Sequence, residues 1–149
     1  FPLTFRDPGE LWRGVSLAGP VLDRFLDSEL ERYRLPPNRL ALVGFSQGTM
    51  MALHVGLRRS SGPAAIVGFS GVLAGPEHLV STIKARPPVS SFTASWTTYP
   101  VEAIHLTREA LAAAHVPVEW HIRPGIGHQI DPGGLRMAAH FLAQMLGPV

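Results

Sequence analysis

An apolar run over residues 40–45 leads directly into a glycine-flanked serine, Ser46. An apolar run without alternation predicts a strand buried on both faces of a parallel sheet. Residues 47–59 then carry apolar side chains at helical spacing and end in two arginines, which suit the C-terminus of a helix. The chain is therefore expected to turn sharply from a buried strand into a helix, with Ser46 at the turn.

Strand-like and helix-like segments alternate along the rest of the chain. The first helix is predicted over residues 15–33, where Pro20 must lie near its start or kink it. Asp131 followed by Pro132 is typical of a cap and first turn, and predicts a last helix from there. This alternation predicts one α/β domain whose mostly parallel sheet has helices on both faces. Further strands are predicted over residues 64–69 and 116–123, and a further helix over residues 100–114.

Composition excludes several classes of protein. The 149 residues suit a single domain, and the absence of cysteine excludes disulfides and thiolate metal sites and favours a cytoplasmic location. No apolar run reaches 18 residues, so no membrane insertion is expected. The net charge is only +2 and the basic residues are scattered, which argues against binding to nucleic acid. Nothing in the composition indicates an oligomeric state.

The segment Gly44-Phe45-Ser46-Gln47-Gly48 matches the G-x-S-x-G pattern of a nucleophile elbow. In such a turn Ser46 adopts a strained conformation that exposes its hydroxyl, and Gly44 and Gly48 let the backbone pass closely. The N–H of Gln47 is expected to donate to an oxyanion at the helix N-terminus. The pattern also arises by chance, but the strand before it and the helix after it favour catalysis. The similar residues 68–71 lack the last glycine and are interpreted as a strand end.

A base is expected after the last strand, and His128 lies there in a glycine-rich loop over residues 124–130. Its role would be to accept the proton of Ser46 and return it to the leaving group. The alternative is an ordinary loop histidine. Because the sequence has no H-E-x-x-H or similar spacing, no metal is expected.

Four segments resemble the phospholipase/carboxylesterase family, which includes relatives of acyl-protein thioesterases. These are residues 1–7, 40–51, 101–113 and 118–130. The resemblance implies an α/β-hydrolase fold and cofactor-free hydrolysis of a small-molecule ester, such as a lysophospholipid or an acyl thioester. It also implies an acyl-Ser46 intermediate and a Ser-Asp-His triad.

Relative to that family, residues 1–149 look like the C-terminal two-thirds of one domain. The N-terminal strands are expected to be missing, together with a His-Gly-x-Gly-type loop that supplies a second oxyanion donor. The absence of one such donor lowers the rate about 10²–10³-fold. Four side chains could line an acyl pocket, although core packing is the alternative for each of them: Met50, Phe69, Leu73 and Trp96.

The chain departs from the family at the triad acid. No aspartate occurs between Asp27 and Asp131, and residues 90–100 are polar where an apolar strand and a His-Gly-x-x-Asp segment belong. Glu102 is the nearest substitute, although an exposed acid in a first helical turn is the simpler interpretation. The loss of the orienting acid lowers kcat about 10⁴-fold in well-studied triads.

A local frameshift is one hypothesis for residues 90–100. With suitable codons, the frame that begins one nucleotide earlier reads Leu-Ile-Val-His-Gly-Glu-Leu-Asp-Asp-Val-Pro, which is the family segment almost intact. Sequencing the DNA over these codons tests the hypothesis. The leading prediction is thus a serine carboxylesterase, and the alternative is a non-catalytic or truncated domain of the same fold. A basic interaction module has little support.

Overall fold

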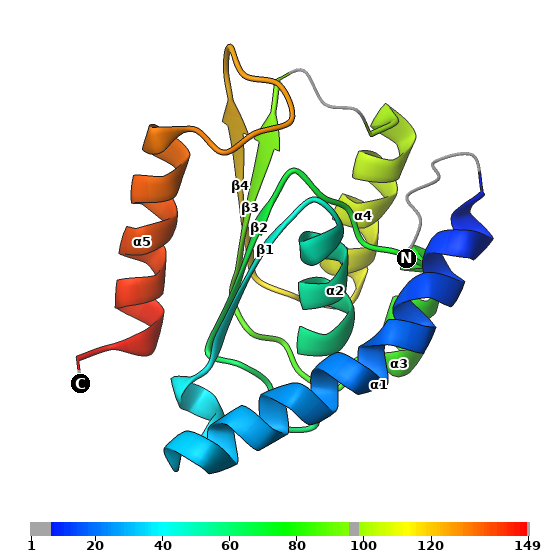
Figure 1. Cartoon of the computed structure of the whole chain (residues 1–149). Coiled ribbons are helices and arrows are strands. Elements are labelled where there is room, and N and C mark those ends of the chain that lie inside the picture. Colours follow the sequence, from blue (N-terminus) through cyan, green and yellow to red (C-terminus); the bar gives the residue numbers. More distant parts are fainter. Residues whose placement is uncertain (1–6, 96–98, 149) are drawn as a thin grey trace.

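The computed structural model describes residues 7–95 and 99–148. Four strands and five helices alternate along the chain, and two short 3₁₀ turns, Pro37–Arg39 and Pro76–His78, precede β1 and α3 (Figure 1). The strands are β1 (Ala41–Phe45), β2 (Ala65–Phe69), β3 (Val89–Ala94) and β4 (Val118–Arg123). The helices are α1 (Pro8–Tyr33), α2 (Gln47–Gly56), α3 (Leu79–Thr82), α4 (Val101–Ala113) and α5 (Pro132–Leu146).

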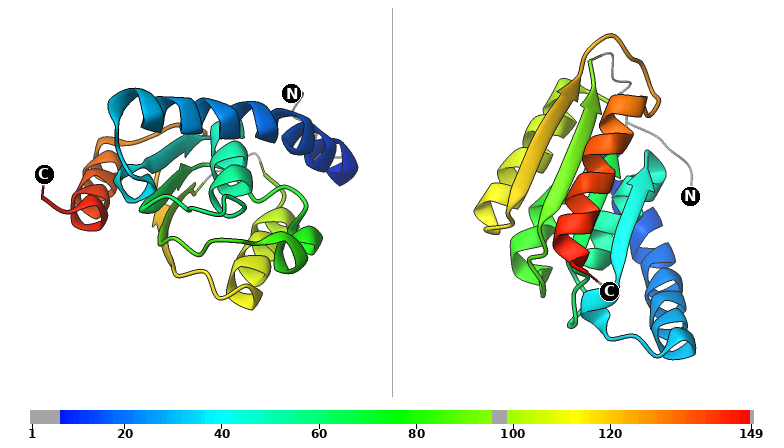
Figure 2. Two further views of the ribbon diagram at one scale, coloured as in Figure 1. Left: turned by 90° about the horizontal axis from the view of Figure 1, so that it is seen from below. Right: turned by 90° about the vertical axis from the view of Figure 1, so that its left-hand side faces the viewer.

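All strands pair in parallel in the order β1-β2-β3-β4. Helices α1 to α4 lie on one side of the sheet and α5 lies on the other, as Figures 1 and 2 show. The predicted α/β architecture with helices on both faces is confirmed. Because parallel strands end at one edge of the sheet, the turns after β1, β2 and β3 and the loop after β4 all gather at that edge.

The buried core lies on both faces of the central strands. Every residue of β2 is buried, as the apolar run predicted. On the α5 side, Phe141 packs against Val67, Phe69 and Phe92. On the opposite side, α2 and the following strands bury a larger cluster around Ile66.

The prediction that residues 40–45 are buried on both faces is wrong for β1. Val43 is 56% exposed and Phe45 is 39% exposed, whereas Leu42 is buried. The reason is that α5 packs on β2 and β3, so the α5 side of β1 has no such cover in the described chain.

Helix α1 begins earlier than the apolar spacing predicted. Asp7 caps it by accepting a hydrogen bond from the Gly9 N–H at 2.9 Å, and Pro8 occupies its first turn. Pro20 lies inside the helix and not near its start. On this helix Leu11 and Val15 are buried, whereas the apolar residues Val21 and Phe25 are more than half exposed.

Helix α2 ends at Gly56, three residues before the predicted end. The next turn brings Arg59 against α1, where its guanidinium contacts the carboxylates of Asp23 and Asp27, each at 2.7 Å. Arg59 is 7% exposed, so it fixes the position of α1 on α2 and does not serve as a solvated helix end.

The polar segment that follows residue 88 forms the central strand β3, paired with both β2 and β4. Ser90 is fully buried there, and its hydroxyl has no hydrogen-bond partner within the described residues. A buried hydroxyl without a partner costs about 1–3 kcal/mol. The strand therefore forms in the place that the family pattern requires, with a residue that suits it poorly.

Candidate active site

The serine predicted as nucleophile lies at a strained turn between β1 and α2. Ser46 has φ 55° and ψ −115°, a conformation that side-chain-bearing residues rarely adopt. A Cβ added to Gly44 would lie 2.4 Å from the carbonyl group of Gly48, so the turn requires glycine at position 44. A Cβ at Gly48 would meet no atom within 4 Å in the described chain. The close approach thus depends on Gly44 having no side chain, and not on Gly48.

The turn is held by the neighbouring strand and by the first turn of α2. The Ser46 N–H donates to the Phe69 carbonyl at 2.8 Å, and the Ser46 carbonyl accepts from the N–H groups of Thr49 and Met50. Gly71 lies directly against this turn, because a Cβ there would be 2.4 Å from Thr49 Cβ. Gln47 is the first residue of α2, so its N–H belongs to the positive end of the helix.

The predicted base meets the predicted nucleophile. His128, in the loop between β4 and α5, places its Nε2 2.9 Å from Ser46 Oγ, although 82 residues separate the two in sequence. The Phe45 ring lies beside the imidazole, with ring centroids 4.9 Å apart. The hydroxyl of Ser46 is thus within direct proton-transfer distance of an imidazole nitrogen.

An ion pair closes the base of the loop that carries His128. Arg123 ends β4, and its guanidinium makes a bidentate contact with the carboxylate of Asp131, at 3.1 Å from Nε and 2.9 Å from Nη2. Asp131 also caps α5 by accepting from the Gly134 N–H, as predicted. The hydrogen bonds from Arg123 hold the pKa of the Asp131 carboxyl below its usual value. The Asp131 carboxylate therefore pairs with Arg123 and caps α5, and it does not orient the imidazole of His128.

The end of β3 also supports this loop. The Ser95 hydroxyl accepts from the Gly125 N–H at 3.0 Å, and the Ser95 N–H donates to the Arg123 carbonyl at 3.0 Å. The atypical segment that starts at residue 90 therefore positions the histidine loop, even though it lacks the expected aspartate.

No carboxylate forms a hydrogen bond or an ion pair with His128 within residues 7–95 and 99–148. Glu102 is exposed in the first turn of α4 and forms no hydrogen bond or ion pair with the site within the described residues. The three other acidic residues between Ser46 and His128 each lie beside another histidine: Glu77 by His78, Glu109 by His105 and Glu119 by His121. The geometry does not bring the proposed substitute Glu102 to the imidazole.

Tyr99 is a member of the site that sequence reasoning missed. Its hydroxyl lies 3.2 Å from Ser46 Oγ, and the residue is only 4% exposed. Burial raises the pKa of the Tyr99 phenol, and the hydrogen bond with Ser46 lowers it by less. The only available signal was its position, because Tyr99 closes the segment between β3 and α4 at the edge of the sheet where Ser46 lies.

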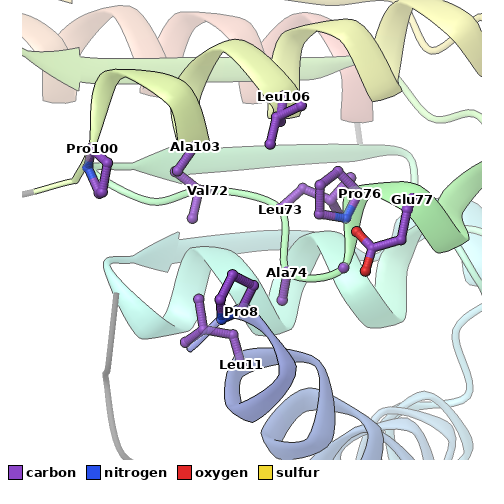
Figure 3. A pocket seen from close by; sticks show the side chains of 11 residues that line it. Pro8, Leu11, Val72, Leu73, Ala74, Pro76, Glu77, Pro100, Ala103 and Leu106 are labelled. Carbon is purple, nitrogen blue, oxygen red and sulfur yellow. The ribbon is translucent and has the colours of Figure 1, made fainter. Parts of the chain in front are cut away.

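An apolar cavity of about 110 Å³ lies between the start of α1, the turn after β2 and the start of α4 (Figure 3). Its walls include Leu11, Val72 and Pro100, and Leu73 among the predicted acyl-pocket residues. Two other residues predicted for an acyl pocket, Met50 and Phe69, are buried in core clusters and do not line this cavity. The remaining one, Trp96, lies outside the described residues.

The described chain contains no cluster of three or more histidine or acidic side chains arranged to hold a metal ion. Among the described helices, none has the length and apolar character needed to cross a bilayer.

Comparison with known proteins gives similarity over nearly the whole chain. Esterase PE8 has a solved structure that superposes with a TM-score of 0.89 and 36% identity, covering 97% of this chain and 69% of that chain. Acyl-protein thioesterase 2 from Zea mays superposes with a TM-score of 0.73 at 20% identity, over 91% of this chain and 66% of that chain, which supports the fold alone.

Acyl-protein thioesterase 1 from Gibberella zeae is 29% identical over 141 residues, which cover 91% of this chain. The chain spans about 60% of the length of that thioesterase. Residues 10–146 match the model of the phospholipase/carboxylesterase family. This match covers most of the chain, and it agrees with the parallel sheet and with the serine at the turn after β1. The chain therefore belongs to the phospholipase/carboxylesterase family.

Proposed function

We propose that this chain is a serine carboxylesterase domain that hydrolyses carboxylic esters through an acyl-Ser46 intermediate. The observation that carries the proposal is the 2.9 Å approach of Ser46 Oγ and His128 Nε2 at a strained strand-to-helix turn. The match to the phospholipase/carboxylesterase family and the similarity to an esterase and a thioesterase also support ester hydrolysis.

The reaction runs in two steps. His128 Nε2 accepts the Ser46 proton while Oγ attacks the acyl carbon, and the carbonyl electrons move to the oxygen, which becomes an oxyanion. The oxyanion re-forms the carbonyl and expels the leaving group, which takes the proton from the imidazolium. Water, deprotonated by His128, then attacks the acyl carbon and releases the acid and the free Ser46 hydroxyl.

One oxyanion donor is the Gln47 N–H at the start of α2. A backbone N–H there is fixed by the helix and lies at its positive end, so it stabilises the developing charge without reorganisation. Gly44 contributes indirectly to oxyanion stabilisation. Because it has no side chain, the backbone can make the tight turn that positions Ser46 and Gln47.

We propose that the acyl portion of the substrate occupies the apolar cavity between the start of α1, the turn after β2 and the start of α4. Its lining is almost entirely apolar, with Glu77 as the one acidic residue among those that the described structure places around it. Such walls suit a hydrocarbon chain and give no counterion for a charged acyl group. A lysophospholipid or an acyl thioester carries a chain of this kind.

A slow reaction is expected because no carboxylate stabilises the imidazolium in the described chain. Removal of the acid from a complete triad lowers kcat about 10⁴-fold, while the remaining groups still give catalysis over water. The proposal therefore predicts detectable acylation of Ser46 with low turnover.

Labelling with a fluorophosphonate probe tests the proposal, because the probe reacts only with an activated serine. The wild-type chain should be labelled, and Ser46→Ala and His128→Ala should not. Ser70→Ala is a matched serine control, since Ser70 is also buried and also has a positive φ of 50°. His140→Ala on the exposed side of α5 is the control for the histidine. Absence of labelling in a folded wild-type sample would support the alternative, a non-catalytic domain.

A further inference from the structure

We propose that Tyr99 is a catalytic residue of this esterase, and that its phenol donates a hydrogen bond to Ser46 Oγ while the serine loses its proton. The inference rests on the proposed function and adds to it a group that stabilises the nucleophile.

The distance alone allows either hydroxyl to be the donor of this hydrogen bond, and the proton transfer to His128 sets its direction. A serine hydroxyl has one proton and two lone pairs. In the reactive arrangement its proton points to His128 Nε2, 2.9 Å away, because the imidazole must accept it. Ser46 Oγ then has only lone pairs to offer Tyr99, whose hydroxyl lies 3.2 Å away. The phenol must therefore be the donor.

The surroundings of Tyr99 keep it in the donor form and in place. Burial raises the pKa of the phenol, so the proton stays on Tyr99 throughout the neutral range. The ring packs in a buried cluster with Leu11, Val15, Met50 and Val72, which holds it in one position. A fixed donor aimed at an atom that gains negative charge is already organised for the reaction.

This donor acts at the point where the site lacks a carboxylate. When His128 accepts the Ser46 proton, Oγ becomes more negative, and a hydrogen bond to a charged oxygen is about twice as strong as one to a neutral oxygen. In a triad the acid stabilises the imidazolium. Here Tyr99 stabilises the other half of the same ion pair, the serine oxygen, and it keeps its own proton throughout the step.

The test compares Tyr99→Phe with the wild type in the rate constant of fluorophosphonate labelling, measured from neutral pH up to the highest pH at which both proteins stay folded, because burial raises the pKa of the phenol above its ordinary value. We expect labelling to slow roughly 10–100-fold, as for the loss of one charge-assisted hydrogen bond. We also expect the wild-type rate to fall at alkaline pH as the phenol ionises, and this fall to be absent from the variant. Tyr33→Phe is the matched control, because Tyr33 is 61% exposed at the end of α1.

A second measurement changes the pKa of the Tyr99 phenol while it keeps the aromatic ring, the hydroxyl and the fold. With Tyr33→Phe as background, Tyr99 is the remaining tyrosine in the sequence, so growth on a fluorinated tyrosine lowers the pKa of that phenol alone. The alkaline fall in labelling should then move to lower pH. An unchanged alkaline profile, or Tyr99→Phe labelling at the wild-type rate, would overturn the role of Tyr99. Absence of labelling in the wild type would instead refute the proposed function.

Discussion

Replacement of Ser46 by glycine should separate backbone strain from chemistry at the turn. The φ of 55° and ψ of −115° place Ser46 in a conformation that costs about 1–3 kcal/mol for a residue with a Cβ. Glycine removes that strain, but its freedom in the unfolded chain costs roughly 0.5–1 kcal/mol. Ser46→Gly should therefore be more stable than Ser46→Ala by roughly 1 kcal/mol. Both variants lack Oγ, so the comparison leaves out the hydrogen bonds of the hydroxyl.

Urea denaturation of the two variants measures this difference. Ala139→Gly is a suitable control, because Ala139 is exposed inside α5, where glycine should destabilise the fold by about 1 kcal/mol. Opposite signs at positions 46 and 139 are the expected result. If glycine destabilises both positions to a similar extent, Ser46 is not strained, and the account of the turn is wrong.

Three further predictions concern the turn at Ser46, the buried side chain of His54 and the loop that carries His128. Gly44→Ala should destabilise the fold by roughly 3 kcal/mol and abolish labelling, because the added Cβ would overlap the Gly48 backbone. Urea denaturation measures the first effect and the fluorophosphonate reaction the second. A variant that is as stable as the wild type and is labelled contradicts this expectation. Burial, with a smaller effect from a nearby arginine, lowers the pKa of His54 from 6.5 to about 4. As the pH falls, the unfolded chain therefore binds a proton at His54 before the folded chain does. The free energy of unfolding is at its full value above pH 6.5 and decreases as the pH falls toward 4. The loss should be about 2 kcal/mol between about pH 7.5 and about pH 5 and should disappear in His54→Gln; an unaltered pH dependence in that variant refutes the assignment. Arg123→Met should leave the thermal midpoint nearly unchanged but increase hydrogen exchange in the loop of His128 and slow labelling, whereas unchanged exchange would show that the ion pair does not hold the loop.

The features that could be predicted from sequence depend on local rules. The turn at Ser46 follows from an apolar strand, two glycines and a helix in immediate succession, and the start of α5 follows from an aspartate cap before proline. The fully buried β2 follows from an apolar run. Each of these involves neighbours in the chain, so a pattern a few residues long contains enough information.

The features that could not be predicted depend on contacts distant in sequence. The exposure of Val43 and Phe45 follows from where α5 packs, which the strand's own residues do not encode. The end of α2 depends on the pairing of Arg59 with two acids of α1. Tyr99 joins the site because β3 and β1 lie in one sheet. The polar residues of β3 lack the apolar pattern of a buried strand, so only the family resemblance indicated a strand there.

The frameshift hypothesis for residues 90–100 remains a prediction. The unpartnered hydroxyl of Ser90 within the described sheet is what an unsuited sequence would leave in a central strand. The hydrogen bonds of Ser95 and Tyr99 nevertheless connect this segment to both halves of the candidate site. DNA sequencing over these codons distinguishes the two reading frames.

The most direct measurement of the central claim is the mass of the protein shortly after mixing with an activated ester such as 4-nitrophenyl butanoate. Low turnover should let the intermediate accumulate, so the chain should gain one butanoyl group, and fragment analysis should place it on Ser46 in the wild type and on no residue in His128→Ala. Acylation at another residue, or ester hydrolysis that persists undiminished in Ser46→Ala, would contradict the account.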